Sequence, residues 1–292
     1  MNEVDRFYQQ AFNRNIGLLT EDEQKRLRQA RVAIVGMGGV GGFHLTTLAR
    51  LGVGRFSIAD MDSFEPANIQ RQCGAYSDTM GKNKAEVMKG IALSINPHLE
   101  MRVFAEGVNK DNLDSFLDGA EVFIDGIDFF SIDERRLIFR RAAEKGAYAI
   151  TAGPLGFGSA MLVFKPGGMT FDEYFDLNDR MSYEDKIIAF GIGLAPASVH
   201  MSYLKLEAVD LQKKTGPSLV SACNLSSVLA ATETLNVLLR RNEPLTVPHY
   251  MQFDPFARRL KTGYLWLGNR NPIQRLKRAL ARRYFVKRNN SK

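Results

Sequence analysis

The sequence of 292 residues predicts an α/β fold, a doubly wound and mostly parallel sheet with helices on both faces and antiparallel strands toward the C-terminal side. Three observations predict it. Strand-like and helix-like segments alternate between residues 31 and 153. The strand-like segments, such as "RVAIVG", are apolar without alternation, as strands buried on both faces require. After Gly153 the alternation stops, and short strand-like segments follow.

Each element has its own pattern. A polar stretch at 5–29 reads as helical, with Thr20 as a plausible N-cap before "EDEQKRLRQA". The expected strands are 31–36, 55–60, 100–105, 121–126 and 147–153, and the expected helices between them are 41–53, 81–95, 110–118 and 131–145. Beyond them we expect an edge strand at 158–168, an irregular segment at 169–216, a long buried helix at 218–241, a β pair at 249–255 and 258–267, and a basic helical tail.

The charge of the chain is unevenly distributed. The formal net charge is +7, but nine of the 39 Lys and Arg residues lie in 270–292, which holds no acid. Residues 1–269 therefore carry 30 basic and 32 acidic groups, a net charge of −2. Any argument for a nucleic acid or a membrane surface must therefore concern the tail.

Composition also narrows the class of protein. The polar start "MNEVDRFYQQ" lacks the pattern of a signal peptide, and no apolar run reaches the roughly 18 residues that span a bilayer. The two cysteines, Cys73 and Cys223, make neither a disulfide framework nor a Cys-x-x-Cys metal site. We expect a cytoplasmic protein.

A glycine-rich turn follows the first strand. Gly36, Gly38 and Gly41 form G-x-G-x-x-G, and Gly39 lies in the same turn. Such a turn lets backbone N–H groups approach a phosphate at the start of a helix, on a Rossmann-like sheet. Asp60 ends the second strand, where an acid can bind ribose hydroxyls. The turn predicts an adenine nucleotide without separating NAD from ATP, and a turn that only packs helix on strand is the alternative.

Cations after the second strand favour a triphosphate. Asn68 and Arg71 lie in the loop "NIQRQ", and Lys82 and Lys84 begin the next helix in "GKNKAE". The start of a helix already carries positive partial charge, so extra cations there are unfavourable unless an anion is bound. A dinucleotide needs fewer cations, because the glycine turn serves most of its pyrophosphate. Lys82 also fits a solvated helix face, so we rank it below Lys84.

The motifs together are similar to one family. "GMGGVG", "ADMD", "NIQRQ", "GKNKAE", "SINPH" and "FIDGID" occur in the order and approximate spacing of the ThiF/MoeB/HesA family, the adenylyltransferases that resemble ubiquitin-activating enzymes. The similarity covers about 10–165 and the helix at 219–241. It implies a nucleotide-binding adenylyltransferase domain over 1–269, in which 165–216 is the crossover segment that meets the substrate, followed by the basic amphipathic tail 270–292.

The resemblance also implies roles for single residues. Asp60 would bind the ribose, Asn68 would orient the phosphates, and Asp128 would hold Mg²⁺. The implied nucleotide-binding residues are Gly36, Gly38, Gly39, Gly41, Asp60, Asp62, Asn68, Arg71 and Lys84. The implied catalytic residues are Arg14, Arg71, Lys84 and Asp128, with Arg14 of "FNRNIG" supplied by the partner subunit of a homodimer.

Each role has a plain structural alternative. Asp60 fits a turn residue at a strand end, Arg71 a surface ion pair, and Arg14 a surface residue. Asp128 fits a helix N-cap, and Asp125 is its rival as a metal ligand.

The implied reaction consumes ATP and Mg²⁺. A substrate carboxylate attacks the α-phosphorus of ATP and gives an acyl adenylate and pyrophosphate. Catalysis then depends on positioning and on stabilising charge on phosphate oxygens. The family's commonest substrate is the C-terminus of a ubiquitin-like sulfur carrier; a peptide, as in microcin-type adenylation, is also open. Alternatives are a TcdA-like ATP-driven dehydration of a modified tRNA adenosine, an NAD(P)-dependent oxidoreductase, and a nucleotide-binding scaffold without turnover.

The sequence departs from the family pattern at its cysteines. Without Cys-x-x-Cys pairs we expect no structural zinc, and 165–215 contains no cysteine that could form a thioester. Cys223 fits a buried small apolar residue. Cys73 follows Arg71 closely, and nearby cations could lower its pKa. His44, His98, His200 and His249 have no metal-site spacing and are expected to be structural.

The tail leaves three readings open. Ile273, Leu276, Leu280 and Tyr284 fall on one helical stripe surrounded by Arg and Lys. The stripe could dock on the protein while the cations pair with the acidic stretch at 172–185. The tail could instead lie on an anionic membrane, or bind RNA or an acidic peptide.

Overall fold

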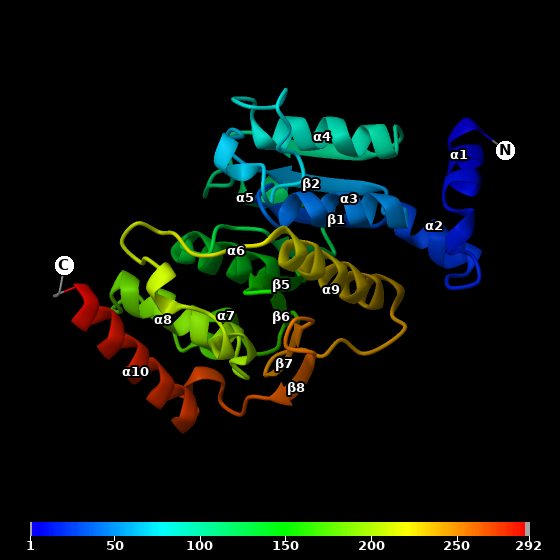
Figure 1. Cartoon of the computed structure of the whole chain (residues 1–292). Helices are drawn as coiled ribbons and strands as arrows, with labels where there is room; N and C mark the ends of the chain where they lie inside the picture. The colour runs from blue at the N-terminus through cyan, green and yellow to red at the C-terminus, as the bar shows by residue number, and fades with distance from the viewer. Residues whose placement is uncertain (1, 290–292) are drawn as a thin grey trace.

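The computed structural model describes residues 2–289, without the side chains of residues 286, 288 and 289. It places helices on both faces of one eight-stranded sheet (Figure 1). The strands are β1 (Arg31–Val35), β2 (Arg55–Ala59), β3 (Glu100–Phe104), β4 (Val122–Asp125), β5 (Tyr148–Leu155), β6 (Gly158–Phe164), β7 (His249–Asp254) and β8 (Arg259–Tyr264). The α-helices are α1 (Glu3–Ala11), α2 (Glu21–Gln29), α3 (Gly41–Leu51), α4 (Lys84–Ile95), α5 (Leu113–Leu117), α6 (Ile132–Glu144), α7 (Phe171–Phe175), α8 (Tyr183–Leu194), α9 (Val220–Leu239) and α10 (Pro272–Asn289). Short 3-10 helices lie at Asn13–Asn15, Pro66–Asn68, Val199–Ser202, Leu206–Ala208 and Gly268–Arg270.

The sheet is doubly wound, as the sequence predicts. Its strand order is β3-β2-β1-β4-β5-β6-β7-β8. The five strands from β3 to β5 pair in parallel, and the pairs from β5 to β8 are antiparallel. The order of the strands reverses between β1 and β4, so the loops after these two strands open the crevice in which α/β sheets bind ligands.

Two hydrophobic cores lie on the two faces of the sheet. Val32 and Ile34 of β1 belong to the core beneath α3, α4 and α9, while Ala33 and Val35 belong to the core beneath α5, α6 and α8. Both faces of the strand are apolar because both are covered. The absence of alternation in "RVAIVG" therefore has the predicted physical cause.

Three expected elements differ in the structure. The helical stretch at 5–29 is two helices, because Gly17 adopts φ of +105° and Thr20 starts α2 with a capping box to Glu23. The strand at 158–168 ends at Phe164 and is not an edge strand, since β6 lies between β5 and β7.

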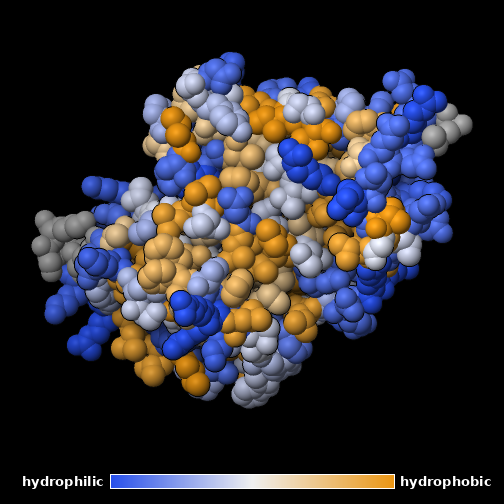
Figure 2. All heavy atoms as spheres, turned by 45° about the vertical axis from the view of Figure 1, so that its right-hand side comes forward, coloured by the Kyte–Doolittle hydropathy of each residue, from blue (hydrophilic) through white to orange (hydrophobic). Residues whose placement is uncertain are grey.

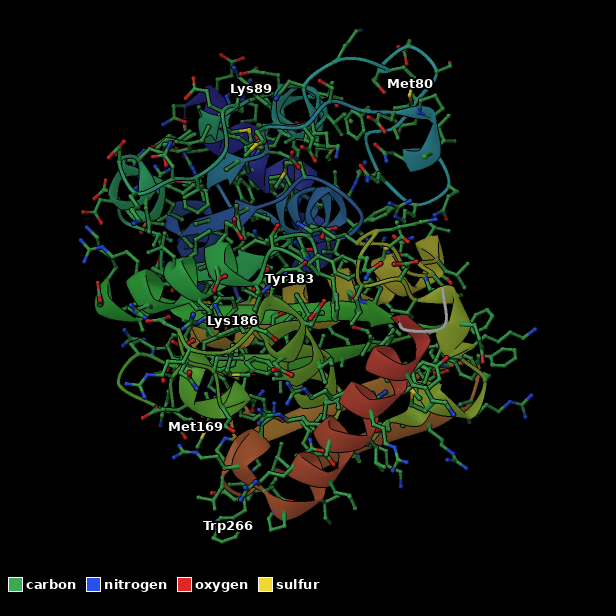
Figure 3. The ribbon with its side chains drawn as sticks, turned by 90° about the vertical axis from the view of Figure 1, so that its left-hand side faces the viewer. Met80, Lys89, Met169, Tyr183, Lys186 and Trp266 are labelled. Carbon is green, nitrogen blue, oxygen red and sulfur yellow. The ribbon has the colours of Figure 1, made fainter. Side chains whose placement is uncertain are left out.

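The segment at 169–216, expected to be irregular, contains α7 and α8. Ser182 caps α8 by accepting a hydrogen bond from the N–H of Asp185. Figure 3 shows Tyr183 and Lys186 of this helix, which reach the loop between β4 and α6 and the first turn of α6. The Tyr183 hydroxyl donates to the carbonyl of Phe130 at 3.0 Å, and the Lys186 ammonium lies 2.8 Å from Asp133. The helix thus covers the start of α6.

The tail helix α10 packs on α8 with an unexpected face. Arg278 pairs with Asp176 at 2.6 Å and Arg282 with Asp185 at 3.1 Å, which confirms the expected pairing with the acidic stretch. The predicted docking of the apolar stripe is wrong, because three of its four residues point outward. The exposed fractions of Ile273, Leu276 and Leu280 are 66%, 60% and 58%. Gln274 and Lys277 face α8 and the loop after it instead.

Among the described residues, α9 is long and apolar enough to cross a membrane, contrary to the expectation that no segment is. Half of its most apolar stretch is buried against the sheet and α3, and a core helix passes the same test of length and composition.

A buried ion pair fixes the chain where it leaves β4. Asp125 ends this strand and lies 2.8 Å from Arg135 of α6, and each side chain is only 2% exposed. Arg135 also donates to the carbonyl oxygens of Ile127 and Asp128, at 2.7 and 3.1 Å. One guanidinium thus holds both the strand end and the loop that follows it.

Arg135→Met is expected to lower the free energy of unfolding by about 3–5 kcal/mol, because it leaves the Asp125 carboxylate buried without its partner. Urea unfolding measures the change. Arg141→Met is the matched control, because Arg141 pairs with the exposed Asp114 and its loss should cost at most about 1 kcal/mol. Equal losses for the two variants would contradict the role of the buried pair.

His44 of α3 gives the folded protein a pH dependence. The side chain is fully buried and neither ring nitrogen has a hydrogen-bond partner among the described residues. Burial lowers the pKa of His44 to about 3. The unfolded chain therefore takes up a proton from about pH 6.5 downward that the folded protein does not take up until about pH 3. The stability contributed by neutral His44 is complete above this window and is lost as the pH falls through it.

His44→Leu should therefore flatten part of the acid-side decline in stability. Between pH 6.5 and 5 the free energy of unfolding of the wild type should fall by about 2 kcal/mol more than that of the variant. Urea unfolding at a series of pH values tests this difference, and parallel curves for the two proteins would contradict it.

Candidate active site

The glycine turn packs backbone against backbone. Gly36 adopts φ of +82°, and a Cβ atom on it would lie 2.1 Å from the carbonyl oxygen of Gly126. A Cβ atom on Gly41 would lie 1.6 Å from the carbonyl oxygen of Gly36. At Gly38 and Gly39 the nearest atoms to such a Cβ belong to Gln72, at 3.6 Å, and Cys223, at 3.3 Å. Gly36 and Gly41 are therefore required by packing, while Gly38 and Gly39 leave backbone accessible at the start of α3.

Asp60 reaches the same turn from the end of β2. Its carboxylate accepts hydrogen bonds from the N–H groups of Met37, at 2.6 Å, and Asp62, at 2.8 Å. Burial raises the pKa of the Asp60 carboxyl, against the lowering effect of these two donors and of Lys84. The residue is therefore part of the turn itself, and it lies where an acid after the second strand was expected.

Lys84 lies at the first position of α4 with its ammonium almost buried. The residue is 7% exposed, and its Nζ lies 3.0 Å from Asp62, whose side chain is 65% exposed. The Lys84 N–H also donates to the carbonyl of Asp62 at 2.8 Å. The Lys84 side of this ion pair is thus buried, while the Asp62 carboxylate faces solvent. Lys82 is exposed, as a solvated helix face requires.

The loop "NIQRQ" lies between the glycine turn and the start of α9. Asn68 is buried, and its side-chain amide oxygen Oδ1 accepts a hydrogen bond from the N–H of Glu65 at 3.0 Å. Arg71 donates to the carbonyl of Ala67 at 3.1 Å. No carboxylate in the described part of the chain pairs with Arg71, so the surface ion pair considered as an alternative is not formed.

Asp128 stands on the loop that Arg135 holds. Its side chain is exposed, and one carboxylate oxygen accepts from the N–H of Phe130 at 2.9 Å. That bond caps a turn just before α6, close to the expected alternative of an N-cap. The second oxygen has no hydrogen-bond partner among residues 2–289. Asp125, the rival ligand, is committed to Arg135 and to the N–H of Ile127.

Arg14 does not reach the other site residues of its own chain. It is exposed without an ion pair among the described residues. The neighbouring Asn15 donates to the carbonyl of Leu51, at the C-terminal end of α3. The glycine turn lies at the opposite end of this 11-residue helix, which is about 15 Å long.

The buried cysteine and histidine side chains agree with the expectations except for the pKa of Cys73. Cys223 is fully buried, and burial raises the pKa of its thiol, which confirms its role as a small apolar residue. The suggestion that cations lower the pKa of Cys73 is wrong, because burial raises it and outweighs the effect of Arg50. His200 is buried beside Gln252, and burial lowers its pKa.

Two residues of the site were missed by sequence reasoning. Gln72 is buried beside Gly38, and its side-chain amide oxygen Oε1 has no hydrogen-bond partner in the described structure. It belongs to the quoted motif "NIQRQ", which could have drawn attention to it. Arg135 has no sequence signal, because its role comes from the ion pair that folding brings together.

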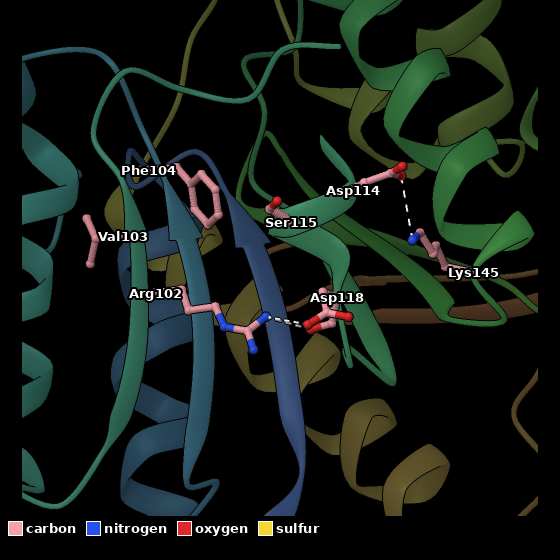
Figure 4. Close-up of a pocket in the computed structure, with 7 residues that line it drawn as sticks. All are labelled: Arg102, Val103, Phe104, Asp114, Ser115, Asp118 and Lys145. Carbon is pink, nitrogen blue, oxygen red and sulfur yellow. Dashed lines mark hydrogen bonds and ion pairs between the residues drawn. The ribbon is translucent and has the colours of Figure 1, made fainter. Parts of the chain in front are cut away.

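One hollow on the surface lies apart from these residues. It lies beside β3 and α5 and is lined by Arg102, Val103, Phe104, Asp114, Ser115, Asp118 and Lys145 (Figure 4). Its charged groups already pair with each other, Arg102 with Asp118 at 3.0 Å and Lys145 with Asp114 at 3.7 Å. Within residues 2–289 no three His, Cys, Asp or Glu side chains are placed to hold a metal ion together.

Curated relatives match less than half of the chain. A tRNA threonylcarbamoyladenosine dehydratase of Haemophilus influenzae is 38% identical over 122 residues, 41% of this chain and 47% of that protein. A SAMP-activating enzyme E1 of Haloferax volcanii is 31% identical over 128 residues, 44% of this chain and 46% of that protein. The chain thus aligns with about half the length of the curated relatives it matches.

Solved structures share the fold. E. coli MccB with ATP superposes with a TM-score of 0.61 at 20% identity, covering 84% of this chain and 65% of that one. PaaA gives 0.66 at 19% identity, covering 90% and 76%. E. coli TcdA, a tRNA N6-threonylcarbamoyladenosine dehydratase, gives 0.60 at 20% identity, covering 82% and 98%. The family model described as "ThiF family" matches residues 12–271, nearly the whole described chain. The chain therefore belongs to the ThiF family.

Proposed function

We propose that the protein is an ATP- and Mg²⁺-dependent adenylyltransferase that activates a carboxylate and releases pyrophosphate. The observation that carries the proposal is the pair of cations beside the glycine turn. Arg71 lacks a carboxylate partner among the described residues, and Lys84 is nearly buried behind one exposed carboxylate. Cations so placed beside a glycine turn whose backbone is accessible at Gly38 and Gly39 fit a polyphosphate.

In this proposal the ribose binds at Asp60 and the phosphates at Gly38, Gly39 and Asn68. Asp62 lies at the edge of the phosphate site. Its carboxylate loses its ion pair with Lys84 when the Lys84 ammonium turns to the phosphates. Arg71 and Lys84 neutralise charge on the phosphate oxygens. A new bond joins a substrate carboxylate oxygen to the α-phosphorus while the bond to the departing pyrophosphate breaks. The attacking carboxylate is already ionised at neutral pH, so no general base is needed.

The donor set at Asp128 fits Mg²⁺. This ion usually takes one or two carboxylates together with substrate phosphates, rather than an all-protein cage. Asp128 offers one exposed carboxylate oxygen on a loop that Arg135 holds in place. When bound, Mg²⁺ would supply charge to the triphosphate oxygens. We propose ATP and Mg²⁺ as the cofactors, without zinc, because the sequence has no Cys-x-x-Cys pair.

A homodimer belongs to the proposal. Arg14 is exposed at the end of α3 remote from its own glycine turn, and next to it Ile16 and Leu18 are 45% and 79% exposed. A partner subunit that covered these apolar side chains would bring Arg14 to the site of the other chain. We also propose a cytoplasmic location, since Cys73 and Cys223 are free thiols.

The carboxylate has two candidate sources. The first is the C-terminus of a peptide or of a ubiquitin-like carrier, which the similarity to an E1-type enzyme and the MccB fold support. The second is the carboxylate of a modified tRNA adenosine, since a tRNA dehydratase is 38% identical over 122 residues. In the second case adenylation would lead to loss of water from the substrate.

Exchange of labelled pyrophosphate into ATP, with each candidate carboxylate added, tests the proposal. Arg71→Ala and Lys84→Met should each lower the exchange rate by about 10²-fold or more, because each removes a cation from the triphosphate. Lys89→Ala is the matched control on the exposed side of α4 and should exchange like the wild type (Figure 3). Unchanged exchange in the first two variants would refute the proposal, and tight NADH binding without ATP binding would favour an oxidoreductase instead.

A further inference from the structure

The outward face of α10 is apolar where a surface helix is normally polar. Ile273, Leu276 and Leu280 follow each other at spacings of three and four residues, and each is at least 58% exposed. The opposite face holds the helix in place through Lys277, which donates to the carbonyl of Pro196 at 2.7 Å, and through Arg278 and Arg282. The helix is therefore held on the protein by its polar contacts, and its apolar face points toward solvent.

Two exposed aromatic side chains lie in the segment that leads into α10. Trp266 precedes α10 and is 59% exposed, as is Tyr264 at the end of β8. Asn271 donates to the carbonyl of Trp266 at 3.4 Å, which ties the segment to the helix start. Figure 3 shows Trp266 at the same end of the molecule as the beginning of α10. In Figure 2 hydrophobic side chains lie beside hydrophilic ones along the lower edge of the molecule.

The charges around the face select an anionic partner. Arg275 and Arg283 are exposed and have no ion pair within the described residues. Residues 1–269 carry a net charge of −2, so the excess of positive charge is concentrated in this part of the chain. A second copy docked on the same face by two-fold symmetry would bring the arginines of the two copies together, which is unfavourable.

The exposed apolar stripe favours a membrane over a nucleic acid as the anionic partner. Phosphate groups of RNA would engage Arg275 and Arg283 but would leave Ile273, Leu276 and Leu280 in water. A bilayer surface meets both needs, because its head groups are anionic and the boundary below them is apolar. Trp and Tyr favour this boundary. The helix has 18 residues and is about 27 Å long, and it would lie in the plane of the surface.

We propose that α10, with Trp266 and Tyr264, binds the surface of an anionic membrane. The proposal is independent of the reaction, because none of the candidate catalytic residues lies on this face. It predicts a peripheral contact through one helix, in which the adenylyltransferase fold stays in water.

Co-sedimentation of the full chain with vesicles tests the proposal. The protein should bind vesicles of equal parts phosphatidylglycerol and phosphatidylcholine, and binding should weaken with added salt and be much weaker to phosphatidylcholine alone. In the variant with Leu276→Glu and Leu280→Glu, the affinity for the anionic vesicles should fall about tenfold or more, because the substitutions place charges in the apolar boundary. Tyr76→Glu, at a residue 54% exposed on another part of the surface, is the matched control and should bind like the wild type.

Three outcomes would overturn the proposal. The first is equal binding of the wild type and the double variant to the anionic vesicles. The second is a change in sedimentation coefficient, without vesicles, that depends on Leu276 and Leu280, which would assign the face to a second copy. The third is binding of single-stranded RNA, lost in Arg275→Ala with Arg283→Ala, with no binding to vesicles. Thermal melting confirms in each case that the variants are folded.

Discussion

The contact between three glycine backbones determines the geometry at the centre of this protein. Gly36 leaves β1 and touches both Gly41, at the start of α3, and Gly126, just after β4. These strands are the neighbours between which the strand order reverses. A single methyl group at Gly36 or Gly41 would push apart elements that the sheet holds together. The approach of these backbones brings Asp60, Lys84 and Asp128 to one edge of the sheet.

Most of the fold could be predicted because it depends on local patterns. The central strands β1 and β4 are nearly continuous apolar runs, and Thr20 marks the start of α2 through its capping box. The places of the candidate site residues in the fold also follow from local patterns, since "ADMD", "NIQRQ" and "GKNKAE" directly follow β2 and the turns after it, while their roles remain proposals. Two features could not be predicted from the sequence: the ion pair of Lys84 with Asp62, and the lack of a carboxylate partner for Arg71 among the described residues. Both depend on distances between loops.

The failures share one cause, which is tertiary context. The helix α8 contains Gly191 and Gly193 and is buried on most of its surface, so its sequence has little amphipathic signal. The stripe on α10 was correctly recognised, but its direction depends on which charges α8 and the preceding acidic stretch present. Arg135 looked like one of several basic residues of α6, and only the fold shows that it neutralises Asp125.

The ion pair between Lys84 and Asp62 has a consequence for how tightly any anion can bind there. The Asp62 carboxylate is held beside the start of α4, because the Lys84 N–H donates to the Asp62 carbonyl at 2.8 Å, and it lies 3.0 Å from the ammonium. Its effective concentration is therefore far higher than that of a free ligand. An incoming anion must displace this internal competitor and gains only the difference between two charge interactions. If the site binds a polyphosphate as proposed, a multiply charged ligand that also engages Arg71 would overcome the competition, while a lone monovalent anion would not. The ion pair would thus make the site select for ligand charge before any chemistry begins.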